Sequence, residues 1–175
     1  MDANNRRDSY AAAWEDYDND GDLDLYVAND FGRNNLYRNV AERGGAPRFA
    51  DVADYAGVVD VGPGMSACWG DYDDDGRTDL YVSNMFSSAG NRVTGQTQFH
   101  ADADAETKGH FRRHARGNSL FANRGTGRFE DVSIAAGVTF GRWAWGSKFA
   151  DLDDDGRLDI LVANGFVSQR STDDL

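Results

Sequence analysis

The stretch DYDNDGDLDLYVAN, residues Asp16–Asn29, joins an acidic pattern to an apolar one. Its first half places aspartate at every second position around a glycine, Gly21, which permits a sharp turn. Its second half contains LDLYVA, a short run of apolar, β-branched and aromatic residues that is typical of a strand. The stretch therefore predicts an acidic loop that leads directly into a buried β-strand.

The same pattern occurs twice more, as DYDDDGRTDLYVSN at Asp71–Asn84 and DLDDDGRLDILVAN at Asp151–Asn164. A second block also repeats: NNLYRN (34–39) and RFADVADYAGV (48–58) match NSLFAN (118–123) and RFEDVSIAAGV (128–138). The AGV segments predict one helical turn that ends at Gly57 or Gly137. Each unit of roughly fifty residues thus contains about four short strands, which is the pattern of a β-propeller blade.

We therefore predict an all-β fold: a partial β-propeller of about two and a half four-stranded blades with one partly helical insertion. The predicted domains are a polar N-terminal tail (1–10), blade 1 (11–61), blade 2 (62–141) with the insertion (86–117), and a partial blade 3 (142–175). The predicted strands cover residues 11–14, 23–28, 35–38, 48–51, 65–70, 79–83, 119–122, 129–132, 143–150 and 159–163. Because propellers have about four to eight blades, we expect the chain to be completed by further repeats or by self-assembly.

The charge of the chain restricts the classes of partner. Its formal net charge of −12 argues against nucleic acids and anionic membranes, which bind basic surfaces. The segments Asp16–Asp24, Asp71–Asp79 and Asp151–Asp159 hold 15 of the 30 acidic residues, so the acid is clustered.

No apolar stretch has the length of a transmembrane segment, and the N-terminus lacks the apolar segment of a signal peptide.

The spacing of the aspartates suits a hard divalent cation. In D-x-D-x-D-G-x-x-D, the side chains at positions 1, 3 and 5 can point into one loop, position 7 offers its backbone carbonyl, and position 9 adds a last carboxylate. These oxygen donors favour Ca²⁺ over zinc. The predicted ligands of three Ca²⁺ sites are Asp16, Asp18, Asp20, Asp22 and Asp24; Asp71, Asp73, Asp75, Arg77 and Asp79; and Asp151, Asp153, Asp155, Arg157 and Asp159, with Asp22, Arg77 and Arg157 acting through their carbonyls.

Two other interpretations of the loops are weaker. An EF-hand begins in the same way but requires Glu at position 12 and a following helix, whereas position 12 is Val27, Val82 or Val162 and a strand follows. A solvated acidic turn would explain one such loop, but three copies in the same frame with the same glycine argue against it.

Calcium binding would have consequences for stability and location. Four carboxylates close together repel one another and raise one another's pKa, and a bound cation removes that penalty. We expect weak affinity, roughly 10⁻⁴–10⁻³ M, as in extracellular modules. The expected location is therefore extracellular, periplasmic or at the cell surface.

The loops WEDYDNDGD (14–22) and WGDYDDDGR (69–77) and the block NSLFANRGTGRFEDVSIAAGV (118–138) resemble FG-GAP/VCBS repeats, the integrin-α-like β-propeller repeats. The resemblance covers residues 11–164 and is greatest to bacterial proteins related to the ASPIC/UnbV and cartilage-acidic-protein families. It implies that each calcium loop joins the first and second strands of a blade. It carries no function over to the insertion.

The insertion holds all three histidines of the chain. Residues 98–116 predict a helix on which His110 and His114, four residues apart, share a face. This spacing is compatible with a transition metal, which Asp102 or Asp104 could join through a bend. A solvated helix on the rim of a blade is the favoured interpretation, and a binding epitope is more plausible here than catalysis.

Single residues elsewhere give no sign of an enzyme. Cys68 aligns with Ala13 and Lys148, which favours a small filler over a reactive thiol. Trp143 and Trp145 raise the question of a carbohydrate platform, but burial in the core is favoured for both. No nucleophile elbow or phosphate-binding glycine loop occurs in the sequence.

Three functions remain from this sequence. The first is a non-enzymatic, calcium-stabilised scaffold for adhesion or protein interaction, with an unidentified protein or carbohydrate ligand. The second is an accessory domain that positions substrate for a larger secreted enzyme. The third is a structural subunit that assembles with copies of itself.

Overall fold

The computed structural model describes residues 7–42 and 45–165, which form three antiparallel sheets. In the first, the order is β1 (Ser9–Glu15), β2 (Asp24–Asn29), β3 (Asn35–Asn39) and β4 (Phe49–Asp51). In the second, it is β5 (Gly64–Gly70), β6 (Asp79–Asn84), β7 (Ser119–Asn123) and β8 (Phe129–Asp131). The third sheet pairs β9 (Ala144–Ala150) with β10 (Asp159–Asn164). The prediction of an all-β fold with propeller-like blades is confirmed, and the sheets do not close into a barrel.

The strand bounds differ from the predicted ones by one or two residues. The largest shift is at β1, which begins at Ser9 because that residue pairs with Asn29. Each sheet also has a register shift at the same place, near Tyr10, Met65 and Trp145. The predicted residues 166–175 of the partial third blade lie outside the described residues.

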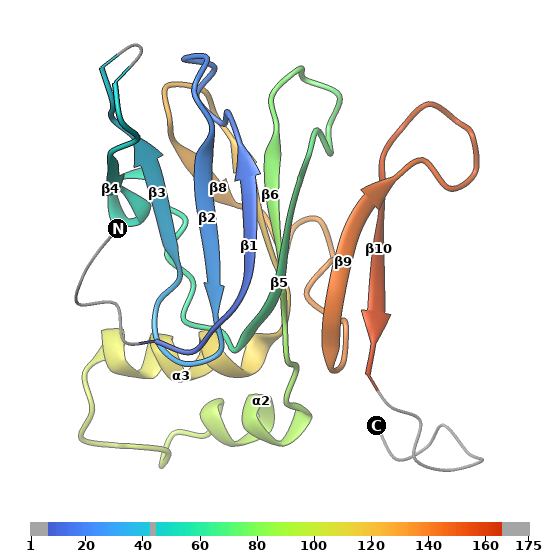
Figure 1. The fold of residues 1–175 in the computed structure, drawn as a ribbon. Coiled ribbons are helices and arrows are strands. Elements are labelled where there is room, and N and C mark those ends of the chain that lie inside the picture. Colours follow the sequence, from blue (N-terminus) through green and yellow to red (C-terminus); the bar gives the residue numbers. More distant parts are fainter. Residues whose placement is uncertain (1–6, 43–44, 166–175) are drawn as a thin grey trace.

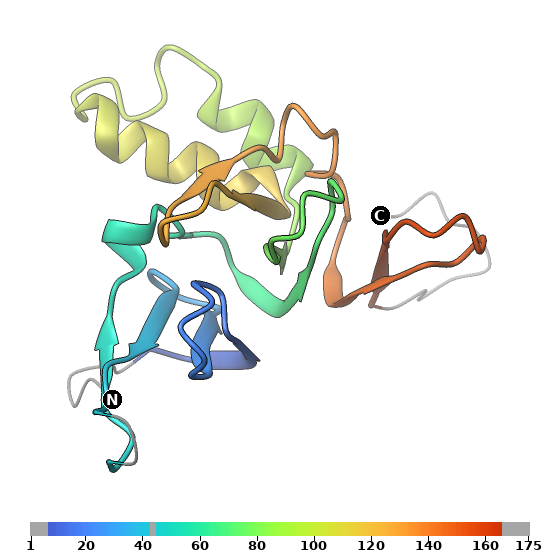
Figure 2. The ribbon, with the colours of Figure 1, turned by 90° about the horizontal axis from the view of Figure 1, so that it is seen from above.

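The first strands of the sheets lie side by side, β1 next to β5 and β5 next to β9. Seen from above, the sheets spread outward from these strands like a fan (Figure 2). The three acidic loops project from one end of the sheets, and the helices of the insertion lie at the opposite end (Figure 1). The fold therefore separates the loops from the insertion.

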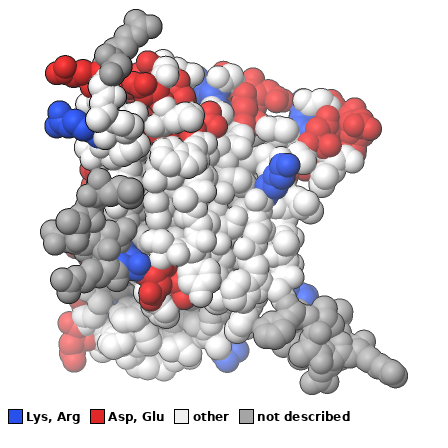
Figure 3. Space-filling view, viewed as in Figure 1, with Lys and Arg blue, Asp and Glu red and all other residues white. Residues whose placement is uncertain are grey.

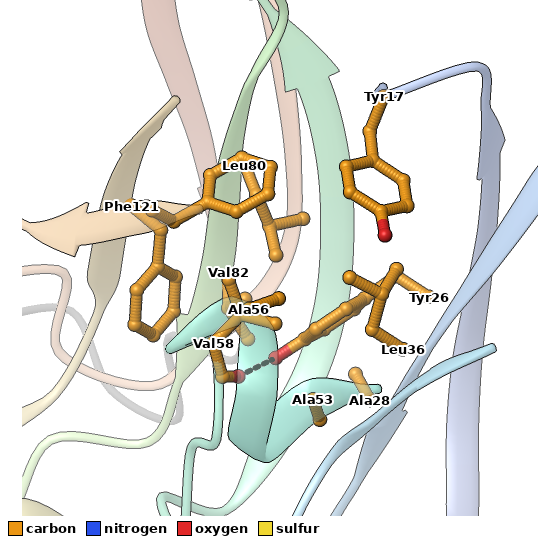
Figure 4. Packing of buried hydrophobic residues seen from close by; sticks show 11 residues of the cluster. Tyr17, Tyr26, Ala28, Leu36, Ala53, Ala56, Val58, Leu80, Val82 and Phe121 are labelled. Carbon is orange, nitrogen blue, oxygen red and sulfur yellow. Dashed lines mark hydrogen bonds between the residues drawn. The ribbon is translucent and has the colours of Figure 1, made fainter. Parts of the chain in front are cut away.

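The largest core fills the space between the first two sheets (Figure 4). Tyr26 and Leu36 of the first sheet, both fully buried, pack with Leu80, Val82 and Phe121 of the second. The helical turn α1 (Ala53–Ala56) and the residues after it also enter this core. α1 ends at Gly57 with φ 79°, as the AGV pattern predicts, because this left-handed conformation favours glycine.

The insertion contains two helices, α2 (Ser88–Thr94) and α3 (Ala105–Arg116), rather than the single helix predicted at residues 98–116. α3 begins later than predicted because the Asp104 side chain accepts a hydrogen bond from Thr107 N at 2.7 Å and so caps the helix there. Ser87 caps α2 in the same way. No helix in the described part of the chain is long and apolar enough to cross a membrane.

A buried ion pair attaches α3 to the segment that connects the two four-stranded sheets. Arg113 Nε donates to Asp60 Oδ1 at 2.9 Å, and Asp60 is fully buried in the segment that connects the first sheet to the second. Asp60 also accepts from Asn84 Nδ2 at 3.0 Å, at the end of β6. Arg113 and Arg116 both bind Asp131 at the end of β8.

The predicted burial of two tryptophans is wrong. Trp143 and Trp145 are 44% and 41% exposed, whereas Met65, the counterpart of Trp145, is 5% exposed. Met65 lies in the middle sheet, which has a neighbour on each face, and the third sheet has a neighbour on only one face among the described residues. Cys68 packs in the cluster between the second and third sheets, where burial raises the pKa of its thiol.

Candidate metal centre

The three acidic loops have the same backbone conformation. Position 4 has positive φ in each, at 58° for Asn19, 57° for Asp74 and 59° for Asp154, and the glycine at position 6 does too. Asn and Asp tolerate this left-handed region better than other residues with a Cβ. The repeated D-x-D-[ND]-D-G pattern therefore specifies one loop shape, three times.

The carboxylate at position 1 holds each loop together. Asp16 accepts from the backbone N–H groups of Asp20 and Gly21, both at 3.0 Å. Asp71 and Asp151 make the same two bonds to their own loops. The carboxylate at position 5 instead accepts from the N–H at position 7, as between Asp20 and Asp22 at 3.1 Å.

The carboxylates at positions 1, 3 and 9 converge in every loop. One oxygen from each member of the set lies within 4.8 Å of the others, in the groups Asp16, Asp18, Asp24; Asp71, Asp73, Asp79; and Asp151, Asp153, Asp159. The position-5 residues Asp20, Asp75 and Asp155 are not members of these groups. Their role as ligands, and that of the carbonyls at position 7, stay predictions.

The first two sites are partly covered by protein. Asp24 and Asp79 are fully buried, and each accepts a 2.7 Å bond from the backbone N–H of the last residue of the third strand, Asn39 or Asn123. Asp159 is exposed, because the third sheet has no third strand among the described residues.

Two buried oxygens of the first site have no hydrogen-bond donor. They are Asp18 Oδ1 and Asp24 Oδ2. Leaving a buried carboxylate oxygen unpaired is costly, and a cation between the two side chains would satisfy both. The donor set is also composed entirely of oxygen, as Ca²⁺ requires. The residues present therefore fit a hard divalent cation.

The pKa values of the site aspartates in the protein without a cation also favour a cation site. Burial is the main cause that raises the pKa of Asp24 to about 7 and that of Asp79 to about 6. The neighbouring aspartates of each loop raise these pKa values further, and the backbone donors at Asn39 and Asn123 oppose the shift. A bound cation would favour the ionised forms and reverse it.

An arginine approaches each of these two loops. Arg38 Nε lies 3.0 Å from Asp18 Oδ2, and Arg124 Nη1 lies 3.8 Å from Asp73 Oδ2. Arg38 immediately precedes Asn39, and Arg124 immediately follows Asn123. Both arginines therefore lie at the end of the third strand of their sheet. They partly neutralise the loops when no cation is bound.

The asparagines Asn39 and Asn123 are the site residues that the sequence analysis did not identify. Beyond its backbone bond to Asp79, Asn123 donates from Nδ2 to Tyr17 O at 3.0 Å and to Thr78 O at 3.1 Å. The available signal was the asparagine that ends both NNLYRN and NSLFAN. Its role depends on the pairing of the third strand with the second, which the linear pattern does not display.

The histidines of the insertion are not part of any candidate metal group. In the described part of the chain, these groups contain aspartates alone. His114 Nδ1 lies 3.0 Å from the carbonyl of Val61, so this side chain contacts the connection between the first and second sheets.

Comparison with known protein families agrees with the repeat pattern. A family model described as FG-GAP-like repeat matches residues 16–82 and 111–162, about two-thirds of the chain, and leaves out most of the insertion. No curated protein matches the chain. The narrower resemblance to the ASPIC/UnbV and cartilage-acidic-protein families stays a prediction. On this match, the prediction of FG-GAP repeats is confirmed, and the chain belongs to the FG-GAP-like repeat family.

Proposed function

We propose that the chain binds three Ca²⁺ ions in its acidic loops, and that these ions stabilise a set of blades that serves as an extracellular scaffold for protein interaction. The observation that carries the proposal is the convergence of carboxylates at positions 1, 3 and 9 in three loops of one shape. The unpaired oxygens of Asp18 and Asp24 support it.

Calcium would act on the fold through charge. Three divalent ions would halve the formal net charge of −12. They would also remove the repulsion among carboxylates, so that binding stabilises the folded chain by mass action. At an affinity of roughly 10⁻⁴–10⁻³ M, the loops would be filled at the millimolar calcium found outside cells.

The scaffold part of the proposal rests on the family. FG-GAP-like repeats suggest a propeller-like domain that interacts with other proteins, and they are typically extracellular. We propose a binding function because the repeats suggest protein interaction and the converging carboxylates suit a cation. The ligand would be bound by the rigid frame of blades rather than by the calcium loops.

The calcium proposal is tested by isothermal titration and by thermal melts in EGTA and in excess Ca²⁺. We expect three sites per chain and a melting temperature that rises by many degrees with calcium. Asp18→Asn should weaken calcium binding at the first site and reduce the calcium-dependent gain, because the amide keeps one oxygen ligand but loses the negative charge.

The matched control is Asp74→Asn, which removes one carboxylate from position 4 of the second loop. Asn19 occupies this position in the first loop with the same backbone conformation, so the variant should keep all three sites. Identical melts with EGTA and with calcium, or equal loss of binding in the two variants, would contradict the proposal.

A further inference from the structure

A pocket of about 450 Å³ lies at the insertion, at the end of the molecule opposite the acidic loops (Figure 1). Thr94 and Gly95 line it from the end of α2, Gly109 lines it from the middle of α3, and Ile134 lines it from the turn after β8. Its volume is within the range of roughly 300–1,000 Å³ that small-molecule sites have. The pocket is therefore a candidate binding site that is separate from the calcium loops.

The charged side chains that line the pocket are all positive. They are Arg112, Arg113 and Arg116 of α3, and no acidic residue among the described ones lines it. In the whole chain, by contrast, 30 acidic residues outnumber 18 lysines and arginines. A local cluster of positive charge in an acidic protein attracts a negatively charged ligand.

Two of these arginines are held in place by carboxylates of the fold. Arg113 binds both Asp60 and Asp131, and Arg116 Nη1 lies 2.9 Å from Asp131 Oδ2. Arg113 Nη2 and Arg116 Nε are nevertheless buried without an acceptor among the described residues. The protein therefore does not supply all the acceptors that these two guanidinium groups can bind.

Arg112 is the member of the cluster that the fold leaves free. Its side chain is exposed and forms no hydrogen bond or ion pair with any residue that the structure describes. Three arginines share the two carboxylates of Asp60 and Asp131, so one positive charge is left over. A guanidinium group can bind a carboxylate through two parallel hydrogen bonds. A ligand with a single carboxylate thus fits both the charge and the geometry of the donor.

The rest of the pocket wall suits an apolar group. Ile134 is 75% exposed, and covering such a side chain is favourable. Gly109 leaves space on α3, because a Cβ added there would meet nothing within 4 Å. Glycine is unfavourable inside a helix, so the room at this position comes at the expense of helix stability.

We propose that this pocket binds a small organic acid, with its carboxylate on Arg112 and its apolar part against Ile134 and Gly109. The site would give the insertion a binding function of its own. The match to FG-GAP-like repeats resumes only at residue 111 and so leaves out α2 and the first half of α3. The proposal is independent of calcium binding, because the pocket shares no residue with the acidic loops.

The experiment is a titration of the full chain in excess calcium, followed by saturation-transfer NMR of the added compound. Benzoate is the probe, and benzamide is its uncharged counterpart of nearly the same shape. We expect benzoate to bind and benzamide to bind at least about tenfold more weakly, because the hydrogen bonds between charged groups are lost. Acetate, which lacks the ring, should also bind more weakly than benzoate.

Two variants test the residues of the pocket. Arg112→Gln removes the free charge and should weaken benzoate binding by about tenfold or more. Gly109→Leu fills the pocket with a good helix-forming side chain, so it should abolish binding while the fold is kept. Arg92→Gln is the matched control, because Arg92 is an exposed arginine of α2 that does not line the pocket, and it should bind benzoate as the wild type does.

Circular dichroism melts establish that each variant is folded. Arg112→Gln keeps the test decisive should Gly109→Leu unfold, because the exposed Arg112 side chain has no partner to lose. Absence of benzoate binding, or equal binding of benzamide, overturns the proposal. So does benzoate binding that survives Arg112→Gln, or that Arg92→Gln weakens as much as Arg112→Gln does.

Discussion

Tyr26 shows how one side chain can fasten two parts of the repeat. Its hydroxyl donates to the carbonyl of Val58 at 3.2 Å and accepts from Asn34 Nδ2 at 3.1 Å, and all of the ring is buried (Figure 4). Burial is the main cause that raises the pKa of this phenol well above its ordinary value, so it stays protonated and can donate. Tyr81 repeats the bond, to the carbonyl of Val138 at 3.3 Å.

Replacing Tyr26 with phenylalanine should lower the free energy of unfolding by about 1–3 kcal/mol, because two buried groups lose their partner while the ring stays in place. Urea denaturation measures this change, and the slope of the transition should stay the same. Tyr10→Phe is the control, since Tyr10 is 58% exposed, and it should change the free energy little. Equal values for the two variants would show that the buried hydroxyl contributes nothing.

Single residues also mark the limits of the sequence analysis. The positions of the aspartates and glycines predicted the three loops, because the local backbone follows directly from these residue types. The exposure of Trp145 was not predictable, because it depends on which sheet lies next to it. Position in a repeat specifies the face on which a side chain lies, and only the neighbouring sheet specifies its burial.

At the scale of elements, ion pairs attach α3 to the connection between the first two sheets and to the end of the second sheet. Burial alone would raise the pKa of Asp60, but the charge of Arg113 and its hydrogen bonds outweigh burial and hold this pKa below its ordinary value. Burial likewise opposes the effect of Arg113, Ser133 and Arg116 on Asp131, and the net result is a lowered pKa there too. Both carboxylates therefore stay charged in the folded chain at pH values where they begin to protonate in the unfolded one.

Because folding lowers both pKa values, the stability that these ion pairs contribute depends on pH in a defined direction. A carboxylate whose pKa is lowered by folding adds stability above its unfolded pKa, near 4, and loses that contribution as the pH falls through the folded value. We expect Asp131→Asn to be less stable than the wild type at pH about 6, with the difference in free energy of unfolding shrinking toward pH about 3. Urea denaturation of both proteins across this range measures it. A difference that is constant or grows with acid would rule out the ion pair as the cause.

The elements themselves were largely predictable, with one exception. Strand positions followed from the repeated frame, because two or three copies of each pattern reinforce one another. The insertion has no second copy in the chain, so its helices had to be predicted from composition alone. The prediction missed α2 and began α3 too early, because neither the Ser87 and Asp104 caps nor the Asp60 contact can be recognised from helix propensity.

At the scale of the whole molecule, charge is concentrated at one end. The acidic loops lie together along the end opposite the helices, as the space-filling view shows (Figure 3). Without a bound cation, carboxylates on neighbouring loops repel one another as well as those within a loop. Salt screens such repulsion over distances that fall from about 10 Å at 0.1 M to about 3 Å at 1 M.

We therefore expect sodium chloride to raise the melting temperature of the chain in EGTA, and to raise it less in saturating calcium. Thermal melts over a salt series in the two conditions measure both slopes. Potassium chloride should give the same slopes, because screening depends on ionic strength and not on the cation. Equal slopes with and without calcium would mean that the loops are not the source of the repulsion.

The bonds made by Asn123 have a consequence for how the ions would be taken up. This residue holds Asp79 of the second loop through its backbone and Tyr17 of the first loop through its side chain, within one asparagine. Asn123 therefore connects the first and second loops directly, in addition to the contacts between their sheets. An ion that orders one loop would therefore lower the entropic cost of ordering the next, and calcium uptake by the first two loops would be positively cooperative.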